Sequence, residues 1–187
     1  DPAPSITGVR SRRLADVEPE TVDWLWPGRI PLGKVSMLVG DPGLGKSLIT
    51  LSIAATVSRG GAWPVAREGR APAGDVVLVS AEDDAGDTIR PRLDAAGADC
   101  RRIHILDGIA DAQGRPLPWS LERLDALESL LASLTDPRLV VIDPVSAYLG
   151  GDIDSHRNSD IRALLAPLSE IASRHRVAML CVSHLNK

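Results

Sequence analysis

Residues 40–47 read Gly40-Asp41-Pro42-Gly43-Leu44-Gly45-Lys46-Ser47, which fits the pattern G-x-x-x-x-G-K-[ST] at every fixed position. The segment stands between a short apolar run, 35–40, and a helix-forming run, 46–59. Glycines allow the loop to curl so that successive backbone N–H groups face inward, and the helix N-terminus adds its positive end. The pattern therefore predicts a cradle for a polyphosphate, with Lys46 reaching the β and γ phosphates and Ser47 binding Mg²⁺.

The whole loop and the first residues of the helix are the predicted nucleotide contacts. They are Gly40, Asp41, Pro42, Gly43, Leu44, Gly45, Lys46, Ser47 and Leu48. We expect ATP and Mg²⁺ as the cofactors of such a site.

The rest of the chain alternates between apolar runs and helical segments. Buried strands are predicted at 35–40, 75–81, 139–143 and 177–182, with a weaker candidate at 102–106. Helices are predicted at 46–59, from about 85 to 96, at 121–134 with Ser120 as N-cap, and at 161–171, where Pro167 should kink or split the helix. Apolar strands separated by helices indicate an α/β fold, with a mostly parallel sheet covered by helices on both faces.

Three polar residues follow the predicted strands directly: Glu82, Asp143 and His184. The carboxyl ends of parallel strands share one edge, so these residues should converge on Lys46 and Ser47. There Asp143 would support Mg²⁺, and Glu82 would orient or deprotonate the attacking water. His184 would donate a hydrogen bond to the γ-phosphate and so report its presence.

Some of these carboxylates have simpler interpretations. Asp143 precedes Pro144, and an Asp at the end of a strand often only caps the next turn. Asp83 and Asp84 are close competitors of Glu82 for the water-activating role, but the favoured interpretation is a charged first turn that interacts with the dipole of the following helix.

Length and composition restrict the classes of protein. The 187 residues, with 44% hydrophobic and 25% charged, suit one globular domain. A net charge of −4 and few aromatic residues (four Trp, one Tyr, no Phe) argue against a broad nucleic-acid-coating surface, although a local basic groove stays open. Two cysteines cannot form a disulfide framework, and no apolar run approaches the length of a membrane span, so we expect a cytoplasmic protein.

We predict one catalytic core with a short segment in front of it. Residues 1–34 show no clean period and are expected to be irregular, with their tryptophans packed on the core. Residues 35–187 are expected to form the core itself.

Four motifs together resemble the RecA/DnaB-type P-loop ATPases, and among these the RepA-like branch of plasmid, phage and mobile-element proteins. The resemblance covers about 24–187 and rests on Gly-Asp-Pro-Gly-Leu-Gly-Lys-Ser, Val-Val-Leu-Val-Ser-Ala-Glu-Asp, Leu-Val-Val-Ile-Asp-Pro and Val-Ser-His-Leu-Asn-Lys. It implies that Glu82 activates water, Asp143 is the Walker B aspartate and His184 is the γ-phosphate sensor. It also implies that Arg92, in the helix after Glu82, contacts adenine.

The resemblance further implies an assembly and a purpose. Members of the family form rings, usually hexamers, with ATP between neighbours and single-stranded DNA in the central hole. It predicts an ATP hydrolase that acts as a replicative DNA helicase or a related DNA-linked motor. The chain stops after the His184 strand, so we expect a core truncated at its C-terminus, without the family's DNA loops and arginine finger.

Two other functions remain open at this point. A P-loop kinase would need an acceptor pocket and a lid, and no insertion of that kind is evident. A KaiC-like regulatory ATPase would use bound nucleotide as an assembly switch and would ignore DNA.

Overall fold

The computed structural model describes residues 11–149 and 158–184, and within α4 it describes the side chains only from residue 165 onward. The last three residues of the Val-Ser-His-Leu-Asn-Lys motif, 185–187, lie outside this range.

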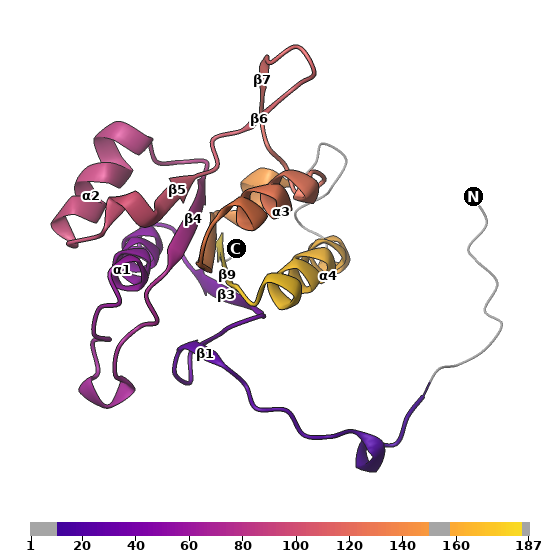
Figure 1. The fold of residues 1–187 in the computed structure, drawn as a ribbon. Coiled ribbons are helices and arrows are strands. Elements are labelled where there is room, and N and C mark those ends of the chain that lie inside the picture. The colour runs from indigo at the N-terminus through magenta and orange to yellow at the C-terminus, as the bar shows by residue number, and fades with distance from the viewer. Residues whose placement is uncertain (1–10, 150–157, 185–187) are drawn as a thin grey trace.

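A five-stranded sheet forms the centre of the molecule (Figure 1). Its strand order is β3-β9-β8-β4-β5, and every neighbouring pair is parallel. The bounds are β3 Val35–Gly40, β4 Asp75–Ser80, β5 Ile103–Ile105, β8 Pro137–Asp143 and β9 Ala178–His184. The predicted α/β class with a parallel sheet is confirmed.

Four helices connect the strands, two on each face of the sheet (Figure 1). Across the sheet, the chain moves from β3 to β4 and on to β5 at the far edge. It then returns toward β3 through β8 and β9. Because parallel crossovers are right-handed, the outward helices cover one face and the returning helices the other. The outward pair is α1 Lys46–Ser58 and α2 Arg90–Ala95; the returning pair is α3 Leu124–Ser133 and α4 Asn158–His175.

Each face of the sheet has its own hydrophobic core, because successive side chains of a strand point to opposite faces. In β4, Val76 and Leu78 pack in the cluster under α1, whereas Val77 and Val79 pack in the cluster under α3 and α4. Strands buried on both faces explain the continuous apolar runs in the sequence.

Short elements fill the connections. Two small antiparallel hairpins are formed by β1 Trp24–Trp26 with β2 Ile30–Pro31, and by β6 Ile109–Ala110 with β7 Pro116–Leu117. One π-helical turn, η3 Ala85–Ile89, precedes α2. The 3-10 turns are η1 Leu14–Asp16, η2 Ala66–Glu68, η4 Cys100–Arg102 and η5 Val145–Tyr148.

The N-terminal segment contains a short hairpin that its sequence did not indicate. The β1–β2 register shifts between Trp24 and Trp26, and Leu25 and Ile30 of this hairpin are buried in the core. Trp26 stacks on Trp63 with ring centroids 4.4 Å apart, whereas Trp24 remains 41% exposed. Long-range packing against the loop after α1 therefore orders a segment whose local sequence shows no period.

Two helix predictions also need correction. Ser120 is not an N-cap: α3 begins at Leu124, and Trp119 and Leu121 ahead of it are buried in the core instead. Pro167 does not split α4, which continues through it to His175. Of the helices in the described part of the chain, none is both long and apolar enough to cross a bilayer.

Candidate active site

The carboxyl ends of four strands bring the predicted site residues to one edge of the sheet. In the strand register Gly40 of β3 lies opposite His184 of β9, and Ser80 of β4 lies opposite Asp143 of β8. Since β9 stands between β3 and β8, the imidazole of His184 is placed between the glycine loop and the aspartate strand. The convergence expected from the parallel topology is therefore observed.

The glycine loop turns from β3 into α1 through two left-handed residues. Gly43 has φ +80° and Gly45, the N-cap of α1, has φ +79°. A side chain is strained at such φ values, so these two positions require glycine for conformational reasons. The neighbouring Leu44 is 68% exposed, and Leu48 on the first turn of α1 is 55% exposed.

The Lys46 side chain is held inside this loop. It is only 7% exposed, and its Nζ donates hydrogen bonds to the carbonyl oxygens of Gly40 and Asp41, each at 2.8 Å. An ammonium group has three N–H donors, so one remains for a further acceptor. A positive charge with a donor to spare, at the N-terminus of a helix, suits a phosphate oxygen.

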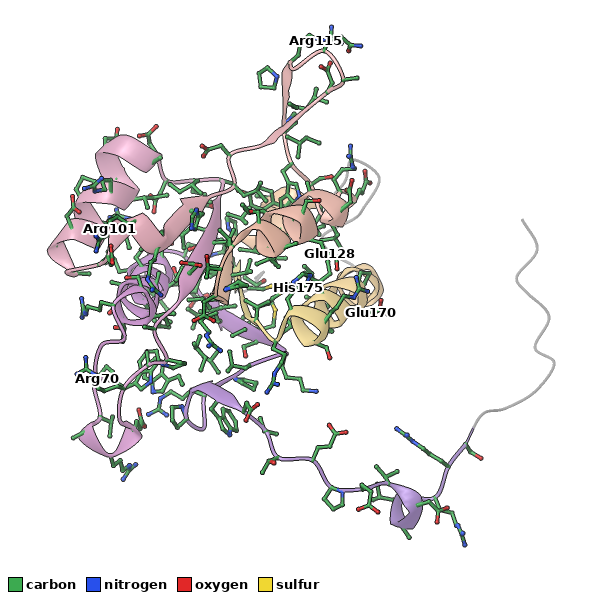
Figure 2. The ribbon with its side chains drawn as sticks, viewed as in Figure 1. Arg70, Arg101, Arg115, Glu128, Glu170 and His175 are labelled. Carbon is green, nitrogen blue, oxygen red and sulfur yellow. The ribbon has the colours of Figure 1, made fainter. Side chains whose placement is uncertain are left out.

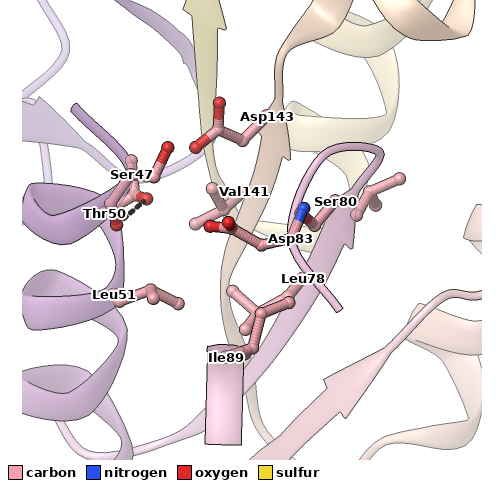
Figure 3. Close-up of a pocket in the computed structure, with 10 residues that line it drawn as sticks. Ser47, Thr50, Leu51, Leu78, Ser80, Asp83, Ile89, Val141 and Asp143 are labelled. Carbon is pink, nitrogen blue, oxygen red and sulfur yellow. Dashed lines mark hydrogen bonds between the residues drawn. The ribbon is translucent and has the colours of Figure 1, made fainter. Parts of the chain in front are cut away.

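Ser47 and Asp143 face each other across a small cavity (Figure 3). Asp143 is 9% exposed, and burial is the main reason why its pKa lies above the usual value. The nearby charges of Glu82 and Asp83 raise this pKa further, whereas a hydrogen bond with Ser47 and the nearby His184 lower it. A divalent cation beside Ser47 would stabilise the buried carboxylate, so the pair fits Mg²⁺.

Glu82 and His184 lie close together but are weakly held. Glu82 Oε1 is 3.8 Å from His184 Nε2, and the Glu82 side chain is 62% exposed. The other ring nitrogen of His184, Nδ1, is buried and finds no hydrogen-bond partner among the described residues. An imidazole with an unsatisfied buried atom at this edge can take part in polar contacts that the protein alone does not supply.

The two acids after Glu82 have separate roles. Asp84 accepts hydrogen bonds from the amides of Asp87 and Gly86, which lower its pKa, and so caps the helical turn as predicted. Asp83 does not: its carboxylate forms an ion pair with Arg92 at 2.8 Å and borders the same cavity as Ser47 and Asp143 (Figure 3). Asp83 thus has a side-chain partner on α2 that the helix-dipole interpretation did not include.

Two further residues of the site were missed from the sequence. Thr50 is 1% exposed and donates to the Ser47 carbonyl at 2.9 Å, and Ser80 Oγ accepts from the Asp83 amide at 3.4 Å. The Asp83–Arg92 pair depends on the π-helical turn η3, which places α2 relative to the 81–84 turn. No local pattern in the sequence predicts a π-helical turn at this position.

Comparison with known proteins agrees with this arrangement. The AAA domain family AAA_25 matches residues 2–187, nearly the whole chain. The chain belongs to this family of RecA-type P-loop ATPases.

Its similar relatives are DNA repair proteins named RadA. The ATPase is 28% identical over 172 residues to the protein from Mycobacterium tuberculosis, covering 90% of this chain and 30% of the relative. For Bacillus subtilis the identity is 24% over 162 residues, covering 86% and 30%. For Streptococcus pneumoniae it is 22% over 197 residues, covering 98% and 40%. The chain thus spans well under half the length of these relatives.

The residues of this AAA-domain ATPase fit the nucleotide and metal that its family uses. Lys46 and the loop amides would hold the phosphates, and Ser47 with Asp143 would hold Mg²⁺. Among the residues placed by the structure, no cluster of three or more His, Cys, Asp or Glu side chains is arranged to bind a metal by itself.

Proposed function

We propose that this AAA-domain ATPase binds and hydrolyses Mg·ATP as one subunit of a ring that works on single-stranded DNA. The observation that carries the proposal is the convergence of Lys46, Ser47, Asp143, Glu82 and His184 on one sheet edge. We further propose the RepA-like replicative helicases, or a related DNA-linked motor of a mobile element, as the functional class. A hexamer in the cytoplasm is the proposed working form.

Each side chain has a proposed task in hydrolysis. Lys46 neutralises charge on the β and γ phosphates, and Ser47 and Asp143 position the metal ion, which supplies charge stabilisation when bound. Glu82 accepts the proton of the attacking water, for which its exposed carboxylate beside His184 is suited. His184 donates to the γ-phosphate. An adenine contact is one of two competing tasks proposed for Arg92.

The DNA-linked part rests on the relatives. RadA proteins are DNA repair proteins by name, and the similarity extends over 86% to 98% of this chain. With a net charge of −4, the chain is expected to contact DNA through a local basic surface, not a broad one.

The test is ATP turnover of the full-length protein with and without single-stranded DNA. Phosphate release should depend on Mg²⁺, rise with DNA, and fall to background in Lys46→Ala, because this substitution removes the charge that the loop presents to the phosphates. ATP affinity should fall in the same variant. A Lys34→Ala variant is the matched control, since Lys34 is exposed and lies before β3, at the opposite end of the strand from the loop.

The outcomes separate the three functions. Turnover stimulated by DNA supports the motor, and turnover that ignores DNA while ATP changes the oligomeric state supports an assembly switch. Transfer of phosphate to an acceptor other than water indicates a kinase. Unchanged ATP affinity in Lys46→Ala would remove the basis of all three.

A further inference from the structure

The carboxylate proposed to activate water has little direct support of its own. The Glu82 side chain is 62% exposed, and its contact with His184 spans 3.8 Å, which is longer than a hydrogen bond. Its position must therefore come from the backbone of the turn that follows β4, residues 81–84. The contacts that hold this turn therefore also determine the position of the Glu82 carboxylate.

The turn is tied at both ends and in its middle. At its start the Ala81 amide donates to the Asp143 carbonyl at 3.2 Å, and at its end Asp84 caps η3. In the middle, the Asp83 amide reaches Ser80 Oγ and the Asp83 carboxylate binds Arg92. Within the described structure, the Arg92 contact is the one tie from the middle of the turn to α2, the helix that follows η3 directly.

The helix that carries Arg92 is a firm anchor. Ile89 and Leu93, on either side of it, are each 3% exposed and belong to the core under α1. Arg92 itself is 40% exposed and donates through its Nη1. A charge-assisted hydrogen bond from a packed helix can therefore hold the turn at a constant distance from the sheet.

We propose that Asp83 and Arg92 are a positioning pair, which holds the 81–84 turn so that Glu82 stays directed at the nucleotide edge of the sheet. This rests on the proposed function, because it assigns Glu82 as the base. For Arg92 it is an alternative to the adenine contact, which would instead raise KM in Arg92→Gln alone, and it gives the Asp83 carboxylate a structural reason to line the cavity.

The two charges of the pair allow a sharp test. Asp83→Asn removes a negative charge from the phosphate site, and Arg92→Gln removes a positive charge near it. If the residues acted through the electrostatics of nucleotide binding, the variants would shift the KM for ATP in opposite directions. As a positioning pair they should instead lower kcat together.

The kinetic experiment uses the full-length protein. Asp83→Asn and Arg92→Gln should each lower kcat about tenfold, since small displacements of a catalytic group are costly, with KM changed by less than about twofold. The double variant should be no slower than the slower single variant, because either substitution already breaks the pair. Arg92→Lys, which keeps the charge within reach of Asp83, should restore part of the rate.

A matched control lies on the same helix. Arg90 forms an exposed ion pair with Asp94 at 2.9 Å, but both residues lie within α2, so this pair does not reach the turn. Arg90→Gln therefore removes the same charge from the same element and should leave kcat unchanged. Exposed pairs contribute little to stability, so all these variants should fold.

A second readout does not depend on catalysis. Hydrogen exchange of the nucleotide-free protein should be faster at the amides of Ala81, Asp83, Gly86 and Asp87 in Asp83→Asn and Arg92→Gln, but not in Arg90→Gln. This hydrogen-exchange measurement tests the positioning role even if the protein does not hydrolyse ATP. In that case only the proposed function fails. Unchanged exchange, a rise in KM confined to Arg92→Gln, or opposite effects of the two variants would each overturn the positioning pair.

Discussion

Glu82, Asp83 and Asp84 are consecutive acids with three different environments. Glu82 faces His184 and solvent, Asp83 is paired with Arg92 beside the cavity, and Asp84 accepts two backbone amides. Ionised carboxylates accept hydrogen bonds only, so each one takes the donors that the backbone brings within reach. Glu82, the one of the three without a firm partner, is the carboxylate available to accept a proton from water.

Glu82→Gln tests that assignment. We expect turnover to fall by about 100-fold or more, because an amide cannot accept the proton of water, while ATP affinity stays near the original value. Phosphate release and equilibrium binding of a fluorescent ATP analogue measure the two quantities. Asp87→Asn, which changes an exposed acid on η3, should leave both unchanged. Equal losses in the two variants would argue for a general charge effect instead.

At the scale of elements, α3 and α4 are joined by a small charged cluster. Glu128 on α3 accepts hydrogen bonds from Arg174 and from His175 at the end of α4, the latter at 3.2 Å (Figure 2). The same helices also contribute Leu127, Leu131 and Leu168 to the core below them. Apolar burial supplies most of the attraction between these helices, and the cluster adds a contact that depends on pH.

The pH dependence of this contact has a definite sign. The hydrogen bond from Arg174, followed by that from His175, lowers the pKa of Glu128 below its usual value. A carboxyl with a lowered pKa stabilises the fold above its unfolded-state pKa, and the contribution is lost as pH falls through the folded-state value. Glu128→Gln should therefore lower the Tm at pH 7, and this difference should shrink toward zero below about pH 4.

Thermal unfolding of both proteins between pH 3 and 8, monitored by circular dichroism, measures this difference. Glu122→Gln is the control, because Glu122 is exposed just ahead of α3. A difference in Tm that persists unchanged into acid would mean that the charge of Glu128 is not the cause.

At the scale of the whole molecule, strand order decides which residues are deep in the core. β9 is the last strand in the sequence, yet it lies inside the sheet between β3 and β8. The strand of the glycine loop, β3, comes earlier in the chain and stands at an edge of the described sheet. The two methionines report this directly: Met179 on β9 is 0% exposed, whereas Met37 on β3 is 39% exposed.

These methionines form a matched pair of substitutions. Met179→Ala should lower the free energy of unfolding by about 2–5 kcal/mol, because it leaves a cavity between packed strands, and Met37→Ala by less than about 1 kcal/mol. Urea unfolding followed by tryptophan fluorescence gives both values. A large loss from Met37→Ala would mean that the edge of β3 is covered by further structure in the full-length protein.

The amino-acid sequence alone determined the local features of this protein. The five strands of the central sheet, the glycine loop and the placement of Lys46, Glu82, Asp143 and His184 at strand ends were predictable, because apolar runs and positive-φ glycines act over a few residues. Only the tertiary structure decided that β9 separates β3 from β8, that Asp83 pairs with Arg92 and that Trp26 stacks on Trp63. These contacts join residues that are distant in the chain or lie across an irregular turn, so their geometry depends on how the whole sheet and its helices pack.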